Sequence, residues 1–134
     1  MNWIDESIAI GNLVEANNVR LLRQQNIDLI VDVRTAFDTN ARLEFFHPRH
    51  NLNYERAEKI SILLVALFDL KASVLVHCLE GIDRTPFIVM LYVARKYNLS
   101  HKAAYNFVKQ RRPQTHFHWK WLQKYERFLA SRQA

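Results

Sequence analysis

Scarce cysteine, scarce glycine and the absence of long apolar runs set the first limits on this sequence. The 134 residues include one cysteine, two glycines and three prolines. A single cysteine excludes a disulfide within the chain. No apolar run reaches the length of about 18 residues that marks a membrane-spanning helix, so no transmembrane segment is expected. Residues 1–6 lack the basic and apolar regions of a secretory signal peptide. Together with the lone cysteine, this predicts a cytoplasmic protein.

Length and composition predict one globular domain over residues 1–134. Hydrophobic residues make up 49% of the chain and charged residues 24%, which is ordinary for a globular protein. A chain of this length buries a sizeable core. Neither an internal repeat nor a low-complexity linker divides it.

The charge is unevenly placed along the chain. Residues 1–80 carry 8 Lys and Arg against 11 Asp and Glu, a net charge of −3, whereas residues 81–134 carry 11 against 2, a net charge of +9. A basic half attracts anionic partners such as phosphorylated proteins, phosphoinositides or RNA. The alternative is an ordinary solvated surface, and the charge alone does not select among anions.

Apolar patterning predicts strands that alternate with helices. Strands are expected at residues 7–10, 28–34, 42–47 and 73–76, and helices at residues 15–25, 54–70, 85–97, 102–110 and 117–131. This alternation indicates a single-domain α/β sandwich, in which a central, mostly parallel sheet of about four or five strands is flanked by helices.

Three of these segments carry predictions about burial. The β-branched strand at 28–34 is typical of a buried parallel strand, and residues 87–94, apolar all round, indicate a central helix. The buried stripe expected on helix 54–70 consists of Ile60, Leu63, Leu64 and Leu67. The stripe expected on the last helix consists of Phe117, Trp121, Tyr125 and Phe128, interpreted as core rather than as a platform for stacking nucleic-acid bases.

The stretch from Val76 to Pro86 concentrates the chemistry of the sequence. It holds the only cysteine, one of the two glycines and an arginine six residues after the cysteine. It lies between the expected strand at 73–76 and the expected buried helix. Such a glycine-containing loop binds anions because unpaired backbone N–H groups and the helix dipole both point at it. The residues expected to bind a phosphate are Leu79, Glu80, Gly81, Ile82, Asp83 and Arg84.

This loop predicts nucleophilic catalysis on a phosphate. A cysteine attacks only as the thiolate, and its ordinary pKa near ~8.5 falls at a helix N-terminus beside an arginine, so Cys78 is the expected nucleophile. Arg84 holds two phosphate oxygens at once. Thr85 places a hydroxyl near the sulfur, and His77 organises the loop through backbone hydrogen bonds. The alternative is that Cys78 is only a small buried hydrophobe. That alternative requires Gly, Arg and Thr to stand at these spacings by chance. The probability of this is on the order of one in several thousand.

The pattern His77-Cys78-x5-Arg84-Thr85 resembles the signature of the protein tyrosine and dual-specificity phosphatases. The resemblance extends to residues 8–12, which are similar to the opening strand and turn of that family, and to residues 111–113, which are similar to its Arg-Pro break before the last helix. It implies a two-step reaction in which Cys78 takes the phosphoryl group and water then hydrolyses the phospho-cysteine. It implies neither a metal nor another cofactor.

The proton donor is where the sequence departs from that family. Its members carry an aspartate on a separate loop, and the matching position, 27 residues before Cys78, is Asn51. Asparagine is no useful proton donor. The remaining candidates are Asp83, His50, His47, Glu44 and Asp38. We favour Asp83 because Cys-x-x-Gly-x-Asp-Arg-Thr is similar to the loop of myotubularin-type lipid phosphatases, in which this aspartate has been proposed as the acid. The alternative is that Asp83 only orients the loop.

A further alternative is that no acid is needed, which depends on the leaving group. Phosphate leaves with a pKa near ~6 and a phenol near ~10, so the loss of an acid harms a phosphoanhydride least and phosphoserine most. The metal-independent RNA 5′-triphosphatases lack that acid, and their His-Cys-x-x-Gly-x-Asn-Arg-Thr loops are similar to this one. We predict a phosphatase acting on phosphotyrosine in proteins, with phosphoserine and phosphothreonine weaker. The alternatives are an RNA 5′-triphosphatase, a phosphoinositide phosphatase and a catalytically weak phosphate-binding module.

Two histidine pairs have spacings that metal ligands also show. They are His116-x-His118 and His47-x-x-His50. Without further cysteines or clustered acids we interpret them as surface histidines, and no metal site is predicted.

Overall fold

The computed structural model describes residues 1–38 and 51–132, and the strand β6 (Val74–His77) lies at its centre. β6 pairs in parallel with β2 on one side and with β3 on the other, and β1 pairs antiparallel with β2. The resulting four-stranded sheet has the order β1-β2-β6-β3. The predicted α/β fold with a mostly parallel sheet is confirmed.

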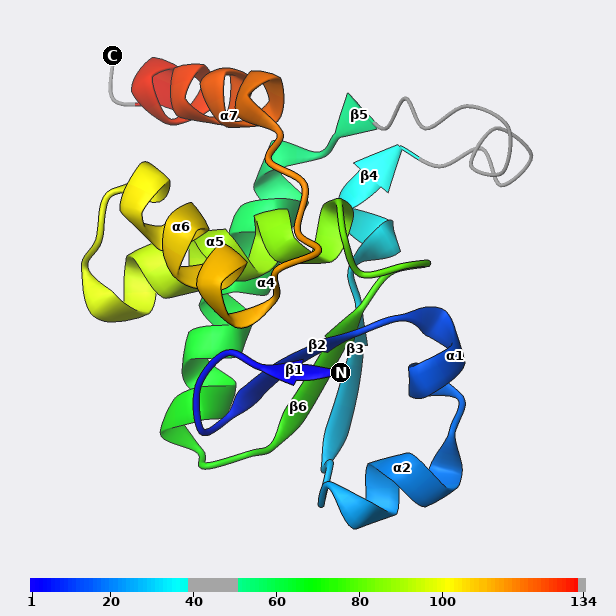
Figure 1. The fold of residues 1–134 in the computed structure, drawn as a ribbon. Helices are drawn as coiled ribbons and strands as arrows, with labels where there is room; N and C mark the ends of the chain where they lie inside the picture. The colour runs from blue at the N-terminus through cyan, green and yellow to red at the C-terminus, as the bar shows by residue number, and fades with distance from the viewer. Residues whose placement is uncertain (39–50, 133–134) are drawn as a thin grey trace.

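The remaining elements follow the chain in the order seen in Figure 1. The strands are β1 (Asn2–Trp3), β2 (Ile8–Gly11), β3 (Leu29–Asp32), β4 (Phe37–Asp38) and β5 (Asn51–Leu52), of which β4 and β5 pair with each other. The helices are α1 (Leu13–Ala16), α2 (Val19–Gln24), α4 (Tyr54–Asp69), α5 (Arg84–Tyr97), α6 (His101–Arg111) and α7 (Trp119–Arg132), with a 3-10 turn at Val33–Ala36. No helix among the described residues is long and apolar enough to span a membrane.

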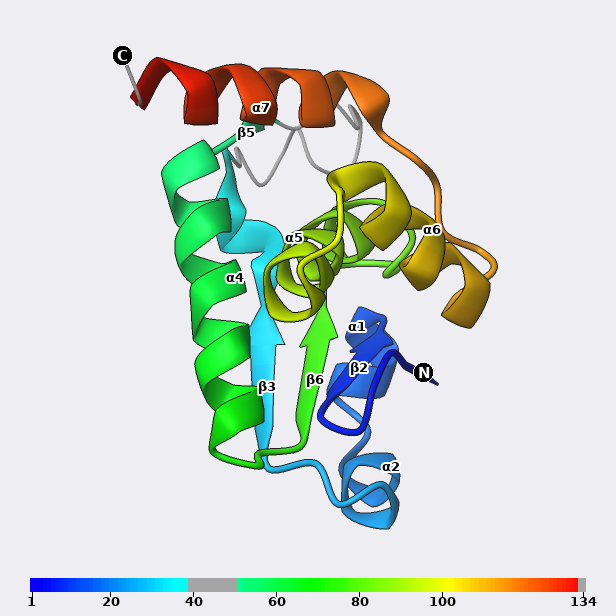
Figure 2. The same ribbon diagram turned by 90° about the vertical axis from the view of Figure 1, so that its left-hand side faces the viewer.

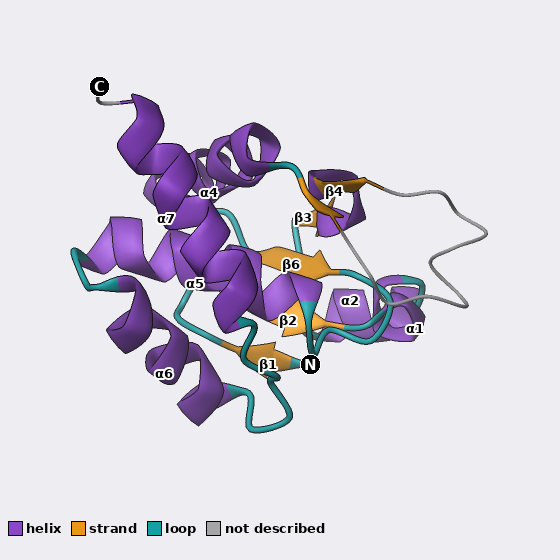
Figure 3. Ribbon diagram, turned by 90° about the horizontal axis from the view of Figure 1, so that it is seen from above, coloured by secondary structure: helices purple, strands orange, loops and turns teal. Residues whose placement is uncertain are grey.

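Helices cover both faces of the sheet. α4, α5 and α6 lie on one face, and the short helices α1 and α2 lie on the other, as the view from above shows (Figure 3). The side chains of β6 alternate between these layers. Val74 and Val76 join the large core under α4 and α5, whereas Leu75 joins a small cluster with Ala9 and Ala16. β6 is therefore fully enclosed and its end is rigidly placed.

α5 is the central helix of the large core, as its composition predicts. All of its residues from Arg84 to Ala94 are buried. α7 crosses the ends of α4 and α5 (Figure 2) and closes the core with its aromatic side chains. The rings of Phe87 and Trp121 are 5.7 Å apart, and those of Tyr54 and Phe128 are 5.4 Å apart. The interpretation of the last helix's aromatic stripe as core is confirmed.

Two predictions about burial are wrong. Of the stripe expected on α4, Ile60, Leu64 and Leu67 are buried, but Leu63 is 45% exposed. β3 is not a buried strand, since Leu29 and Ile30 are 46% and 45% exposed. The reason is its place at the edge of the sheet, which composition does not reveal.

The helix predicted at 15–25 is also wrong, because the chain forms two short helices there. Asn12 caps α1 through a reciprocal pair of hydrogen bonds with Glu15. Asn18 then accepts a hydrogen bond from Leu21 N and begins α2. Asparagine favours N-caps over helix interiors, so Asn18 starts a new helix instead of continuing the old one. The strand predicted at 42–47 lies outside the described residues.

Candidate active site

The loop after β6 lies where three strands present their carboxyl ends. The parallel register sets His77 of β6 opposite Gly11 of β2 and Asp32 of β3. Cys78 follows immediately, and α5 begins at Arg84. In open α/β sheets, ligands bind outside the carboxyl ends of the strands. The fold thus puts the predicted anion loop at the position where such a sheet binds its ligand.

Four consecutive carbonyl groups of the loop accept hydrogen bonds from residues outside it. These bonds run from Leu13 N to Leu79 O (2.9 Å), from Arg112 Nη2 to Glu80 O (3.2 Å), from Arg112 Nε to Gly81 O (2.6 Å) and from His116 N to Ile82 O (2.8 Å). In a planar trans peptide the carbonyl and the following N–H point in opposite directions. The N–H groups of residues 80–83 therefore face the inside of the loop and form a concave anion site.

Cys78 lies inside this ring of N–H groups. Its side chain is 2% exposed, and its Sγ accepts a hydrogen bond from Gly81 N at 3.3 Å. The sulfur therefore lies at the anion site itself, near the start of α5, where the positive end of the helix dipole attracts negative charge.

Gly81 is required at its position by both backbone geometry and space. Its φ is +71°, and a Cβ there would overlap the carbonyl oxygen of Gly11 and lie 2.9 Å from Arg112 Nη2. The first of these atoms belongs to the backbone and the second to a buried side chain, so neither moves aside easily. The loop can approach β2 this closely only with glycine.

The substitution Gly81→Ala is expected to lower the free energy of unfolding by about 2 kcal/mol or more, because it adds both a strained φ and an overlap with backbone. Denaturant titration measures this loss. Gly11→Ala is the matched control, since its φ is not positive and its Cβ would meet only side chains, with Leu75 Cδ1 at 2.8 Å and Glu15 Oε1 at 3.3 Å. A Gly81→Ala protein no less stable than Gly11→Ala would contradict the described loop.

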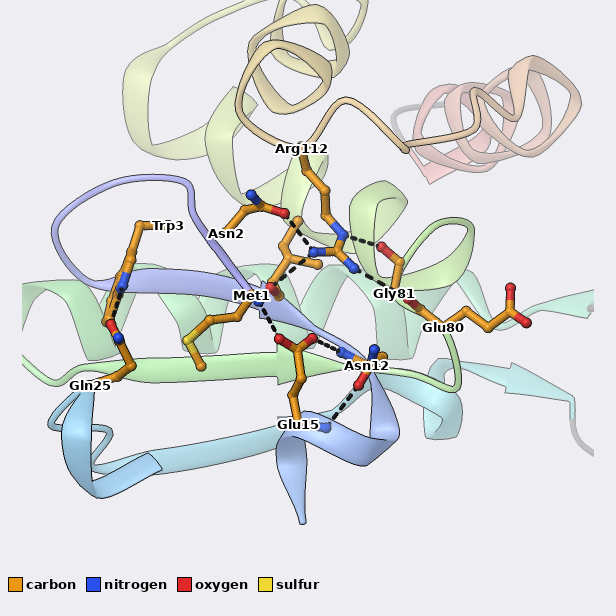
Figure 4. Close-up of polar contacts among 10 residues, drawn as sticks. Met1, Asn2, Trp3, Asn12, Glu15, Gln25, Glu80, Gly81 and Arg112 are labelled. Carbon is orange, nitrogen blue, oxygen red and sulfur yellow. Dashed lines mark hydrogen bonds and ion pairs between the residues drawn. The ribbon is translucent and has the colours of Figure 1, made fainter. Parts of the chain in front are cut away.

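Arg112 holds the loop against the start of the sheet (Figure 4). Besides its two bonds to the loop, it donates from Nη1 to Asn2 Oδ1 at 2.7 Å and to Ile10 O at 3.3 Å. Only 3% of it is exposed. Burial lowers the pKa of Arg112, and the negative charges of Glu15 and Cys78 oppose that shift. No role for Arg112 is predicted from the sequence. The Arg-Pro break at 111–113 was the signal that marked it.

Three further residues of the predicted site lie near Cys78 in the sequence, and all of them are buried: His77, Arg84 and Thr85. Arg84 is 4% exposed at the first turn of α5. His77 Nδ1 lies 3.0 Å from Cys78 O, a backbone contact of the kind predicted for it. Thr85 Oγ1 is fully buried and, among the described residues, has no hydrogen-bond partner. An unsatisfied buried hydroxyl is costly, so its retention here suits a group reserved for a ligand or for the sulfur.

Asp83 is tied to two histidines rather than left open to solvent. Its Oδ1 lies 2.8 Å from His118 Nε2 and 3.1 Å from His116 Nδ1. The hydrogen bond from His118, and then that from His116, hold the pKa of Asp83 below its ordinary value, although burial opposes them. A general acid at neutral pH needs the opposite shift. The geometry thus disfavours Asp83 alone as the proton donor.

The interpretation of His116 and His118 as plain surface histidines needs correction. His116 is exposed on 61% of its side chain, but His118 only on 31%, and both contact the phosphate loop through Asp83. Their spacing gave no hint of this, since the loop lies more than 30 residues earlier. Within residues 1–38 and 51–132 no group of three or more His, Cys, Asp or Glu is arranged to hold a metal.

The other candidates for the acid are not placed by the structure. Glu44, His47 and His50 lie outside the described residues. The side chains of Asp38 and Asn51 lie outside them too, although their backbones pair in β4 and β5. The separate acid loop expected from the family resemblance therefore stays a prediction.

Comparison with known proteins identifies the family. Residues 9–128 match the dual specificity phosphatase catalytic domain. The chain belongs to the dual specificity phosphatase family. It is 35% identical over 118 residues to human dual specificity protein phosphatase 16, and 28% identical over 115 residues to the protein-tyrosine-phosphatase IBR5 of Arabidopsis thaliana.

These matches cover 80% and 84% of the chain, but only 17% and 44% of the two relatives. The chain thus spans less than half the length of either. The crystal structure of a human DUSP28 variant has the same fold, with a TM-score of 0.75 and 25% identity, covering 98% of this chain and 97% of that one. The dual specificity phosphatase fold therefore extends over almost the whole chain.

Proposed function

We propose that this dual specificity phosphatase domain hydrolyses phosphotyrosine in proteins through a phospho-cysteine formed on Cys78. The observation that carries the proposal is the loop itself: four carbonyls turned outward, N–H groups turned inward, and the sulfur accepting one of them. When a phosphate ester enters this ring, the sulfur faces the phosphorus atom from the side opposite the leaving oxygen. Family membership supports the same reaction.

The reaction proceeds in two displacements. The thiolate of Cys78 attacks phosphorus, the bond to the tyrosine oxygen breaks, and that oxygen takes the electron pair and a proton. Water then attacks the phospho-cysteine and releases phosphate and the thiolate. Arg84 holds two phosphate oxygens and balances the charge that spreads over them in each transition state. Because the sulfur and the guanidinium supply nucleophile and positive charge, the reaction needs no metal.

Thr85 and His77 support these steps. The buried hydroxyl of Thr85 donates a hydrogen bond to the sulfur when it leaves as thiolate in the second step. His77 fixes the peptide between Cys78 and Leu79 through its contact with Cys78 O. Leu79, Glu80, Gly81 and Ile82 contribute backbone rather than side-chain chemistry. Asp83 contributes backbone as well and holds the two histidines.

A substrate panel tests the proposal against the alternatives. Purified wild type and Cys78→Ser are compared on an aryl phosphate, phosphotyrosine and phosphoserine peptides, a phosphoinositide and RNA with a 5′-triphosphate. We expect the phosphotyrosine peptide to exceed the phosphoserine peptide, because a phenol leaves more readily than an alcohol. Preferred turnover of the RNA or of the phosphoinositide would overturn the substrate class. Binding without turnover of any of them would indicate a phosphate-binding module.

A further inference from the structure

The first displacement needs a proton for the tyrosine oxygen, and no carboxylic acid is placed to give it among the described residues of the loop. Asp83 is the only acidic side chain between Cys78 and Arg84 other than Glu80. Asp83 is ionised through its two histidines. Glu80 lies on the same loop, but it is exposed, and its carboxylate extends away from Gly81 and Arg112 (Figure 4). Among the described residues, the proton-carrying side chains next to Asp83 are the two histidines bound to it.

His118 is held firmly next to Asp83. Its Nε2 lies 2.8 Å from Asp83 Oδ1, and its backbone N–H donates to the Tyr105 hydroxyl at 3.1 Å. Its ring stacks on Trp121, with ring centres 3.8 Å apart and planes 12° apart. These contacts fix both the position and the plane of the ring. His118 is thus preorganised in a way that an ordinary surface histidine is not.

The backbone brings this ring to the loop and keeps it there. His116 N donates to Ile82 O at 2.8 Å, and Arg112 binds the two preceding loop carbonyls. The segment from Arg112 to His118 is therefore attached along the outer side of the loop. His118 Nδ1 has no hydrogen-bond partner in the part of the chain that the structure describes. Because Nε2 of the His118 ring is bonded to Asp83, Nδ1 is the ring nitrogen that remains to exchange a proton with a ligand.

Resting on the proposed phosphatase reaction, we propose that His118, oriented by Asp83, is the proton donor to the leaving oxygen. In the first step the P–O bond breaks, its electron pair moves to the tyrosine oxygen, and that oxygen takes the proton of His118 Nδ1. The ring is then neutral. In the second step it takes a proton from the attacking water as the P–S bond breaks, which restores the thiolate and the protonated ring.

The groups around this pair fit a single proton-carrying histidine. Arg84 follows Asp83 directly and is buried at the first turn of α5. His116 contacts the same oxygen of Asp83 but is 61% exposed and lacks a described stacking partner. The ammonium group of Lys109, the nearby cation on α6, is bonded to a backbone carbonyl, Thr115 O, at 2.8 Å. Burial raises the pKa of Tyr105, so its hydroxyl stays protonated near neutral pH and does not compete as a base.

A leaving-group series tests this assignment. Phenyl phosphate and 2,4-dinitrophenyl phosphate are compared in wild type, His118→Gln, His116→Gln and the matched control His101→Gln. The phenol needs a proton to leave, whereas the dinitrophenolate leaves without one. We expect His118→Gln to lose about 10²- to 10³-fold in kcat on phenyl phosphate and to change little on the dinitrophenyl ester. His101→Gln is expected to behave like wild type on both, because the ring of His101 contacts Glu126 and not the loop.

Each other outcome overturns the assignment or the reaction beneath it. An equal loss on both esters in His118→Gln indicates a structural role only, and no loss on either removes His118 from the mechanism. If the loss of kcat confined to phenyl phosphate appears in His116→Gln instead, the donor is His116 and not His118. Wild type inactive on both esters contradicts the phosphatase reaction itself. Thermal unfolding of each variant shows whether folding is intact.

The pH profile gives a second readout. Since the first step requires the protonated ring, kcat of wild type on phenyl phosphate should fall as pH rises. This alkaline limb should be absent in His118→Gln and present in the control His101→Gln. A limb retained in His118→Gln would contradict His118 as the donor.

Discussion

Turnover of phosphotyrosine is expected to fall by about 10⁴- to 10⁶-fold in Cys78→Ser, the range seen when a catalytic nucleophile is removed from a preorganised site. Serine keeps the shape of the side chain, but its hydroxyl is far less acidic than a thiol and has no adjacent base among the loop residues to activate it. The N–H groups of the loop and Arg84 remain. Binding of phosphate should therefore survive while kcat collapses, which steady-state kinetics and phosphate-protection of thermal unfolding together measure.

The single cysteine makes this prediction easy to control. Alkylation of the wild type with iodoacetamide can modify no other cysteine, so its loss of activity should match the fraction of Cys78 alkylated. Phosphate should slow the alkylation by occupying the loop. Turnover that persists in Cys78→Ser or after complete alkylation would rule out Cys78 as the nucleophile.

The second large effect is expected at Arg84. Arg84→Lys keeps the positive charge but removes the planar fork that holds two phosphate oxygens at once. We expect kcat/KM to fall by about 10²- to 10³-fold, comparable to the loss of an oxyanion-stabilising donor. Because Arg84 is buried at the first turn of α5, the stability of the variant is measured alongside its kinetics.

Arg95→Lys is the matched control for this effect, because Arg95 is exposed in the last turn of the same helix. It should leave kcat/KM within about twofold of wild type, as expected of a surface substitution away from the site. If Arg84→Lys retained wild-type kcat/KM, charge alone would suffice and the bidentate grip on phosphate would be wrong.

The elements that the sequence predicted well are those whose surroundings are uniform. β6, and α5 as far as Ala94, are buried on all sides, and an apolar run indicates that directly. The predictions that are wrong concern residues whose burial depends on the elements packed next to them. Leu29 and Ile30 of β3 have the composition of buried residues, and only the strand order shows that they lie on an edge. Leu63 likewise sits one position outside the stripe that α5 covers.

The candidate site was predictable only where it is local in sequence. The residues from His77 to Thr85 are consecutive, from the end of β6 to the first turn of α5, so spacing alone brings them together. Arg112, His116 and His118 reach that loop from beyond α6, and their contacts depend on how α5 and α6 pack. The family resemblance marked the first of these three, and nothing in the sequence marked the two histidines as partners of Asp83.

The phospho-cysteine is the central element of the proposed reaction, and rapid-quench mass spectrometry tests it most directly. Wild type and Thr85→Ala are mixed with excess phosphotyrosine peptide, quenched over a time course and digested. Thr85→Ala should slow the departure of the thiolate and so accumulate the intermediate. The predicted result is one phosphoryl group on the peptide that contains Cys78, higher in Thr85→Ala. A phosphoryl group on His116 or His118 instead, or phosphate release with none on Cys78 at any time in either protein, would contradict it.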